Sequence, residues 1–272
     1  MKRSKITILL AIVLGMTFHS CLDLEPQDQL GGKNMWTSVN DYKQFANTFY
    51  SWTRDFSSVV YDGTHSDKRS DLITYQSYNE FSRGINSIPS SDANYTDNYK
   101  HIRRTNLLLQ NAEAYAKPED IKQYIGEAYF FRAYSYFDLL QLYGDVIITK
   151  KPLDITDPEM KVKRNDRSEV VDLIIDDLNH AVENLPAFKE LTTEEEGRIS
   201  KEGAQAFLSR VALYEGTWQK SRNGNQNTQR SANLLDIAAK AARTVIDAKY
   251  GYTFRLLSLI HISEPTRLAL IS

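Results

Sequence analysis

The chain has 272 residues, with 33 basic and 35 acidic side chains and a formal net charge of −2. No basic stripe stands out, which argues against nucleic acid as a partner. Apolar residues make up 42% of the chain, enough for a buried core. The 16 tyrosines add aromatic surface that can pack a core or stack on flat sugar and peptide faces. The single cysteine excludes an internal disulfide.

The first 20 residues have the pattern of an export signal. Three basic residues lie among the first five, and an apolar run from residue 6 to residue 18 follows. This run is shorter than the ~20 residues that a membrane span needs, and it fits the hydrophobic part of a signal peptide. Removal of residues 1–20 would leave 30 basic and 35 acidic side chains, a balance of −5.

A lone cysteine directly after an export signal is typical of a lipoprotein, in which Cys21 becomes the lipidated first residue. Acyl chains would then anchor the protein without a transmembrane helix. The alternative is a free Cys21 beside an ordinary cleavage site. Residues 21–38 are polar and lack helical periodicity, which predicts a tether. Asp23 and Glu25 resemble the acidic signals of surface-exposed lipoproteins in some Gram-negative bacteria.

Residues 39–256 are predicted to form helices that pair as hairpins, because apolar residues recur every three or four positions between short breaks. The predicted helices are Val39–Phe56, Asp92–Ala116, Pro118–Gly144, Ser168–Leu185, Ser200–Tyr214 and Ser231–Val245. We expect serines as the N-caps, namely Ser38 (or Asn40), Ser168, Ser200 and Ser231. Gly216-Thr217-Trp218 is expected to end the fifth helix, and Asp145–Thr149 to be extended.

The segment Pro118–Gly144 is apolar around most of its circumference, so it must be enclosed on more than one side. Gly126 and Ala133 lie on one face and would let another helix come close. The polar sector is predicted to be Gln123, Glu127, Asp138 and Gln141. The fold class that follows is all-α, a tetratricopeptide-like array of helical hairpins with long irregular loops. An ordinary buried helix in another all-α domain is the alternative.

The last 16 residues, 257–272, differ in character from the rest. Leu257–Arg267 reads LSLIHISEPTR and looks like the translation of a transposase adaptor used in sequencing-library preparation. We therefore expect residues 257–272 to be a non-native tail, and the natural protein to continue beyond this point. A genuine apolar C-terminal strand is the alternative.

Four blocks in sequence resemble the SusD/RagB family of outer-membrane nutrient-binding lipoproteins of Bacteroidetes. They are DNYKHIRRTNLLLQNAE (Asp97–Glu113), EAYFFRAYSYFDLLQLYGDVIITKKPLD (Glu127–Asp154), RSEVVDLIIDDLNHAVENLP (Arg167–Pro186) and GRISKEGAQAFLSRVALYEGTW (Gly197–Trp218). The resemblance runs from about Cys21 to Arg255 and lacks the family's C-terminal half.

This resemblance implies a lipid-anchored protein of the outer membrane that faces the cell exterior. It would bind an oligosaccharide or polysaccharide and deliver it to a SusC-type TonB-dependent transporter, without chemistry of its own. A surface-anchored helical-repeat protein that binds a protein or peptide is the alternative function. A lipid-anchored glycosidase is a third.

Catalytic, metal and cofactor sites are not predicted. Asp176 and Asp177 are adjacent on a helix, so they point about 100° apart, and both are interpreted as part of a solvated face. The histidines lack metal-ligand spacing, and no Gly-rich phosphate loop is present. Arg132 lies within an apolar stripe and is interpreted as structural, with a carboxylate or carbonyl as partner.

The long aromatic segment Ser57–Ser91 is the predicted ligand loop. Its aromatic content favours order, and rings on a rigid scaffold suit sugar binding. The candidate ligand-binding residues are Tyr75, Tyr78 and Phe81, with Asp71 or Asn79 to bond hydroxyls. The alternative is that these rings only pack the loop onto the helices.

Overall fold

The computed structural model describes residues 35–54, 84–85, 87–154, 156–222 and 228–248. Within these ranges the architecture is all-helical, as predicted, and the six α-helices are joined by 3₁₀ turns and irregular segments. The helices are α2 (Val39–Asn47), α4 (Ala93–Glu113), α5 (Lys122–Tyr143), α6 (Arg167–Asn184), α7 (Lys201–Arg222) and α8 (Thr228–Asp247). In the same ranges, no helix is both long and apolar enough to cross a membrane.

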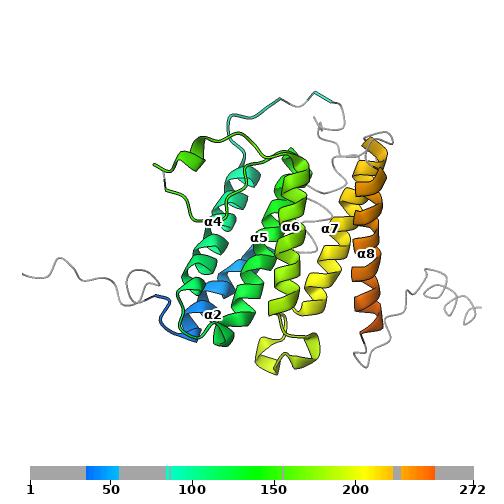
Figure 1. The fold of residues 1–272 in the computed structure, drawn as a ribbon. Helices are drawn as coiled ribbons and strands as arrows, with labels where there is room; N and C mark the ends of the chain where they lie inside the picture. Colours follow the sequence, from blue (N-terminus) through cyan, green and yellow to red (C-terminus); the bar gives the residue numbers. More distant parts are fainter. Residues whose placement is uncertain (1–34, 55–83, 86, 155, 223–227, 249–272) are drawn as a thin grey trace, which may run out of the picture.

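The five long helices α4 to α8 stand side by side in chain order, each packed against the next (Figure 1). The short helix α2 packs against α5 and α4. Large buried side chains from several elements meet in one core, including Tyr42, Phe49, Phe131 and Tyr136. Because each long helix buries a stripe on its neighbours, the row has the hairpin logic of stacked helical repeats.

The N-terminal helix begins where the sequence predicts and ends earlier. Ser38 caps α2 in a reciprocal capping box, in which the Asp41 backbone N–H donates to Ser38 Oγ and the Asp41 carboxylate accepts from the Ser38 N–H. The α-helix ends at Asn47, and Thr48–Trp52 continues as a 3₁₀ helix. The prediction of one helix to Phe56 was therefore too long.

The central helix α5 follows a 3₁₀ turn, Pro118–Ile121, and stops at Gly144, whose φ of 73° suits glycine. Gly126 allows the predicted close approach, since a Cβ there would lie 2.9 Å from Leu185 Cγ. The predicted polar sector was wrong at Glu127, which is fully buried. Arg198 explains this burial, because its Nε and Nη2 donate to the two Glu127 oxygens at 2.7 and 2.8 Å.

The predicted N-caps at Ser168 and Ser231 were wrong, because contacts with distant residues are made at these places instead. Helix α6 begins at Arg167, not after Ser168, and the Arg167 N–H donates to the Asp145 carboxylate at 3.0 Å. Ser231 lies inside α8, where its buried Oγ donates to the Gly216 carbonyl at 2.8 Å. The cap at Ser200 is confirmed, since its Oγ accepts from the Gly203 N–H.

Helix α7 continues through Gly216 to Arg222, so the predicted end at Gly216-Thr217-Trp218 was wrong. The glycine has a packing role instead. A Cβ there would lie 3.0 Å from Leu235 Cγ and 3.3 Å from the Leu235 backbone nitrogen. Gly216 thus lets α8 approach α7 closely.

Candidate functional site

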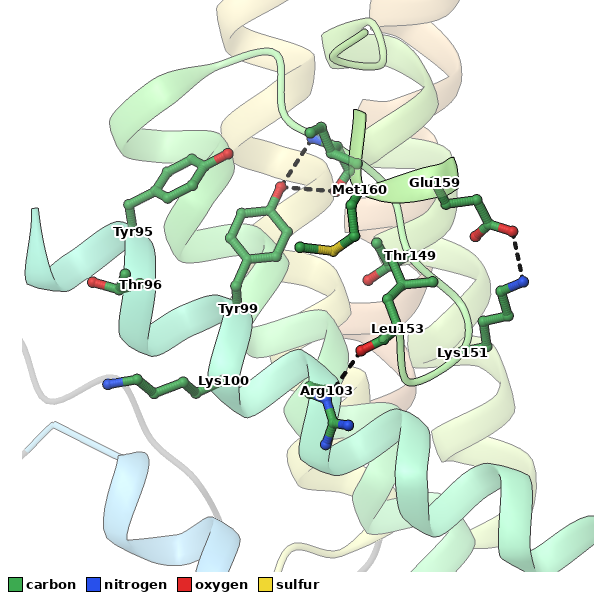
Figure 2. Close-up of a pocket in the computed structure, with 11 residues that line it drawn as sticks. Tyr95, Thr96, Tyr99, Lys100, Arg103, Thr149, Lys151, Leu153, Glu159 and Met160 are labelled. Carbon is green, nitrogen blue, oxygen red and sulfur yellow. Dashed lines mark hydrogen bonds and ion pairs between the residues drawn. The ribbon is translucent and has the colours of Figure 1, made fainter. Parts of the chain in front are cut away.

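The structure has a cavity of about 450 Å³ between α4 and residues of the ranges 147–153 and 159–160, which we call the α4 groove (Figure 2). Most of its lining is apolar, and polar side chains lie around it. The lining residues are Tyr95, Thr96, Tyr99, Lys100, Arg103, Ile147, Thr149, Lys151, Leu153, Glu159 and Met160. The volume lies within the ~300–1,000 Å³ typical of small-ligand sites.

One side of the groove is formed by two tyrosines one turn apart on α4. Tyr95 and Tyr99 have ring centroids 4.8 Å apart. The Tyr99 hydroxyl donates to the Ile147 carbonyl at 2.8 Å and accepts from the Ile147 N–H at 2.9 Å (Figure 2). Burial raises the pKa of Tyr99, so the hydroxyl stays protonated and keeps donating. Tyr99 therefore lines the groove with its ring and holds the opposite backbone with its hydroxyl.

The opposite side is backbone held by two further buried side chains. Tyr136 on α5 accepts from the Thr149 N–H at 2.8 Å and donates to the Thr149 carbonyl at 3.2 Å. Asn106 on α4 donates its amide to the carbonyls of Thr149 and Lys151, at 3.0 and 3.3 Å. The predicted extended segment is thus largely paired with side chains, apart from one antiparallel bridge between Val146 and Asn165.

Arg132 fixes the orientation of the Asn106 amide. Its Nη1 donates to Asn106 Oδ1 at 2.9 Å, and its Nε and Nη2 donate to the two Asp177 oxygens at 2.8 and 2.6 Å. A guanidinium has only donors, so the Asn106 oxygen must face it and the Asn106 NH₂ must face the carbonyls. A relay therefore runs from Asp177 through Arg132 and Asn106 to the groove.

This relay corrects one prediction and confirms another. Asp177 is fully buried and belongs to no solvated face, because it neutralises Arg132, whereas Asp176 is largely exposed. Arg132 has the structural carboxylate partner that the sequence predicted.

Charged side chains surround the groove in pairs. Lys151 Nζ lies 2.7 Å from Glu159 (Figure 2), and Lys100 Nζ lies 2.8 Å from Asp97. Arg103 Nε donates to the Leu153 carbonyl at 3.4 Å. The groove thus combines ring surface with hydrogen-bond donors and an acceptor, which is a suitable composition for a hydroxyl-rich ligand.

A smaller cavity of about 170 Å³ lies on another side of α4. His101 forms part of its lining and stacks on Trp52, with ring centroids 4.1 Å apart. Burial lowers the pKa of His101. In the described ranges, no group of three or more His, Cys, Asp or Glu side chains is arranged to hold a metal ion.

All of the predicted site residues lie outside the described residues. These are Cys21, Asp71, Tyr75, Tyr78, Asn79 and Phe81. The groove, in turn, was not predicted from the sequence, and Tyr95 and Tyr99 were not among the candidate ligand-binding residues. The available signal was the spacing of Tyr95, Tyr99 and Arg103, which places an aromatic pair and a cation on one side of α4.

Comparisons with known proteins agree on one family. The model of a SusD-like family, described as "Starch-binding associating with outer membrane", matches residues 22–213. SusD-like proteins P38 and P2 of Formosa agariphila are each 28% identical, over 78% and 81% of this chain. The chain spans 42% and 45% of their lengths.

Solved structures give the same result for the fold. A SusD-like protein of Bacteroides fragilis matches with a TM-score of 0.60 at 23% identity, over 83% of this chain and 41% of its own. A structure named as a laminarin-binding SusD-like protein matches with a TM-score of 0.52 at 28% identity, over 65% of this chain and 36% of its own. The family model covers well over half of the sequence, so the chain belongs to the SusD-like family of non-catalytic binding proteins associated with the outer membrane.

Proposed function

We propose that this protein is a surface-exposed, lipid-anchored glycan-binding protein that delivers oligosaccharides to a SusC-type TonB-dependent outer-membrane transporter. Lipidation at Cys21 would hold it at the membrane, and the tether of residues 21–38 would give the helical array freedom to move above the surface. The division into a signal (1–20), tether, helical domain (39–256) and non-native tail (257–272) is part of the proposal.

The observation that carries the proposal is the family match over residues 22–213, because that family is described as starch-binding and outer-membrane-associated. The relative named for laminarin binding supports a glycan ligand at 28% identity. The aromatic segment with Tyr75, Tyr78 and Phe81, and the hydrogen-bonding candidates Asp71 and Asn79, remain the proposed ligand loop.

Affinity electrophoresis in gels containing starch, laminarin or xyloglucan tests glycan binding. We expect the purified protein to be retarded in at least one of these gels, and a Tyr75→Ala/Tyr78→Ala variant to lose that retardation, since stacking rings supply much of the contact with a sugar. Unchanged retardation of the variant would remove the loop residues from the proposal. If labelled palmitate did not incorporate into the wild-type protein, under conditions that label a known lipoprotein, the proposed lipid anchor at Cys21 would be wrong.

The second candidate function is binding of a protein or peptide ligand by the same helical array, which stacked hairpins often do. Co-purification from membranes separates the two. A TonB-dependent transporter in the eluate supports glycan delivery, and a soluble protein partner without a transporter supports the alternative.

A further inference from the structure

We propose that the α4 groove is a second glycan-binding site, which takes a short stretch of a neutral oligosaccharide and adds to the affinity of the ligand loop at residues 71–81. This inference rests on the proposed function, because it assumes that the ligand is a glycan. It assigns the sugar contacts to residues of α4 and of the ranges 147–153 and 159–160.

The shape and lining of the groove suit a pyranose ring. A sugar presents C–H groups on its faces and hydroxyls around its edge, so it needs an apolar surface with hydrogen-bonding groups beside it. Tyr95, Tyr99 and Met160 give the apolar surface, and Arg103 provides an exposed donor beside Leu153 (Figure 2).

The charge around the groove favours a neutral glycan over an acidic one. Each cation in the lining has a carboxylate close by: Lys100 with Asp97 at 2.8 Å, Lys151 with Glu159 at 2.7 Å, and Arg103 with Asp154 at 3.9 Å. A uronate or sulfate would face these carboxylates as well as the cations, whereas a hydroxyl can accept from the ammonium and donate to the carboxylate.

The backbone of the groove argues against an extended peptide. A peptide that adds to a strand edge needs free N–H and C=O groups in a row. Here the N–H and C=O of Ile147 are both bonded to Tyr99, and those of Thr149 are both bonded to Tyr136. The side of the groove formed by residues 147–149 therefore offers a ligand its side chains rather than its backbone groups.

The groove is also preorganised. Tyr99, Tyr136 and Asn106 hold the segment 147–151 from two different helices, and Arg132 orients the Asn106 amide. A segment that is fixed before the ligand arrives loses little conformational entropy when the ligand binds, and this favours binding.

Methionine methyl NMR gives a local test. The chain has four methionines. Met160 lines the groove and is half-exposed, whereas Met35, which is 125 positions earlier in the sequence, packs against the hydrophobic core and does not line the groove. We expect the methyl signal of Met160 to shift on addition of oligosaccharides from the polysaccharide that retards the protein, while the signal of Met35 stays in place. The variants Met160→Leu and Met35→Leu assign the two signals.

A matched pair of variants tests the contribution of the groove to affinity. Tyr95→Ala/Arg103→Met removes one ring and one donor, and we expect about tenfold weaker retention in the polysaccharide gel. The control is Arg243→Met, which removes a similarly exposed arginine on α8. Arg243 also lies near an aspartate, Asp247, at 3.7 Å, and we expect the gel to retain this variant as strongly as the parent protein. Tyr99→Phe keeps the ring and frees the backbone of Ile147, so it should also weaken retention.

The outcomes separate the two proposals. Retardation of the parent with an unmoved Met160 signal, or with full retention of Tyr95→Ala/Arg103→Met, would overturn the groove site and leave glycan binding intact. A parent that is not retarded by any of the three polysaccharides and shows no Met160 shift with their oligosaccharides would overturn both.

Discussion

The two ends of the helical row are held together by different chemistry. Between α4, α5 and α6, a buried relay of Asn106, Arg132 and Asp177 crosses three helices and ends on backbone carbonyls. Between α7 and α8, Gly216 allows close apolar contact with Leu235, and hydroxyl-to-carbonyl bonds such as the one from Ser209 to Ala238 complete the contact.

The difference shows what the buried polar groups are for. Burying an ion pair gains little net stability over apolar packing, because both charges lose their hydration. Apolar packing is sufficient where two helices need only lie side by side, as α7 and α8 do. The directional relay occurs where an irregular backbone segment, residues 147–151, must be held in one position beside α4.

The largest expected effect comes from breaking the relay at its carboxylate. Asp177→Asn keeps the shape of the side chain and leaves Arg132 buried without a counter-charge, so we expect a loss of about 3–5 kcal/mol in the free energy of unfolding. Urea denaturation measures it. The neighbouring Asp176→Asn is the control, since that side chain is 60% exposed and should change stability by less than ~0.5 kcal/mol. Equal effects of the two variants would contradict the relay.

A smaller effect is expected at the apolar end, from two glycines of the same helix. Gly216→Ala places a Cβ 3.0 Å from Leu235 Cγ and 3.3 Å from its backbone nitrogen, which cannot rotate away, so we expect a loss of about 1–3 kcal/mol. For Gly203→Ala the one tight contact is with the end of the Ile199 side chain, at 2.7 Å from Cδ1, and the other contacts, with Ile199 Cγ1 and Ser200 Oγ, are at ordinary distances of 3.5 and 3.8 Å. The Ile199 side chain can rotate, and alanine favours the helix by up to ~1 kcal/mol, so Gly203→Ala should be close to neutral or stabilising. Comparable losses in thermal unfolding would contradict the close approach of α8.

The sequence could predict features that depend on neighbouring residues, and it could not predict features that depend on contacts between distant residues. Periodicity located all six helices, because each one buries a continuous stripe and that stripe is visible in the order of residues. Ser38 and Ser200 were found as caps because their partners lie three residues away. The predicted caps at Ser168 and Ser231 were wrong, because the contacts made there, from the Arg167 N–H to Asp145 and from Ser231 to the Gly216 carbonyl, join residues that are distant in the chain.

The burial of charged side chains was also not predicted from the sequence. Glu127 and Asp177 look solvated in the sequence, and each is buried by an arginine from another element, Arg198 and Arg132. Their burial depends on pairings 71 and 45 residues apart, which no local pattern records. The groove was missed for the same reason, since its second side is a segment about 50 residues beyond Tyr99 and Arg103.

The smallest expected effect is a pH dependence at the contact between α4 and the 3₁₀ turn Thr48–Trp52. Burial against Trp52 lowers the pKa of His101 below its ordinary value of 6.5, although Asp97 opposes this shift. The unfolded chain therefore binds a proton more readily than the folded one, so this contribution to stability is present above pH ~6.5 and is lost as the pH falls.

His101→Phe keeps a ring stacked on Trp52 and removes the titration. We expect its free energy of unfolding to fall less steeply than that of the parent between pH ~8 and pH ~5, measured by urea denaturation across that range. Parallel curves for the two proteins would mean that His101 binds protons equally in both states, and that the stack on Trp52 leaves it as accessible to water as in the unfolded chain.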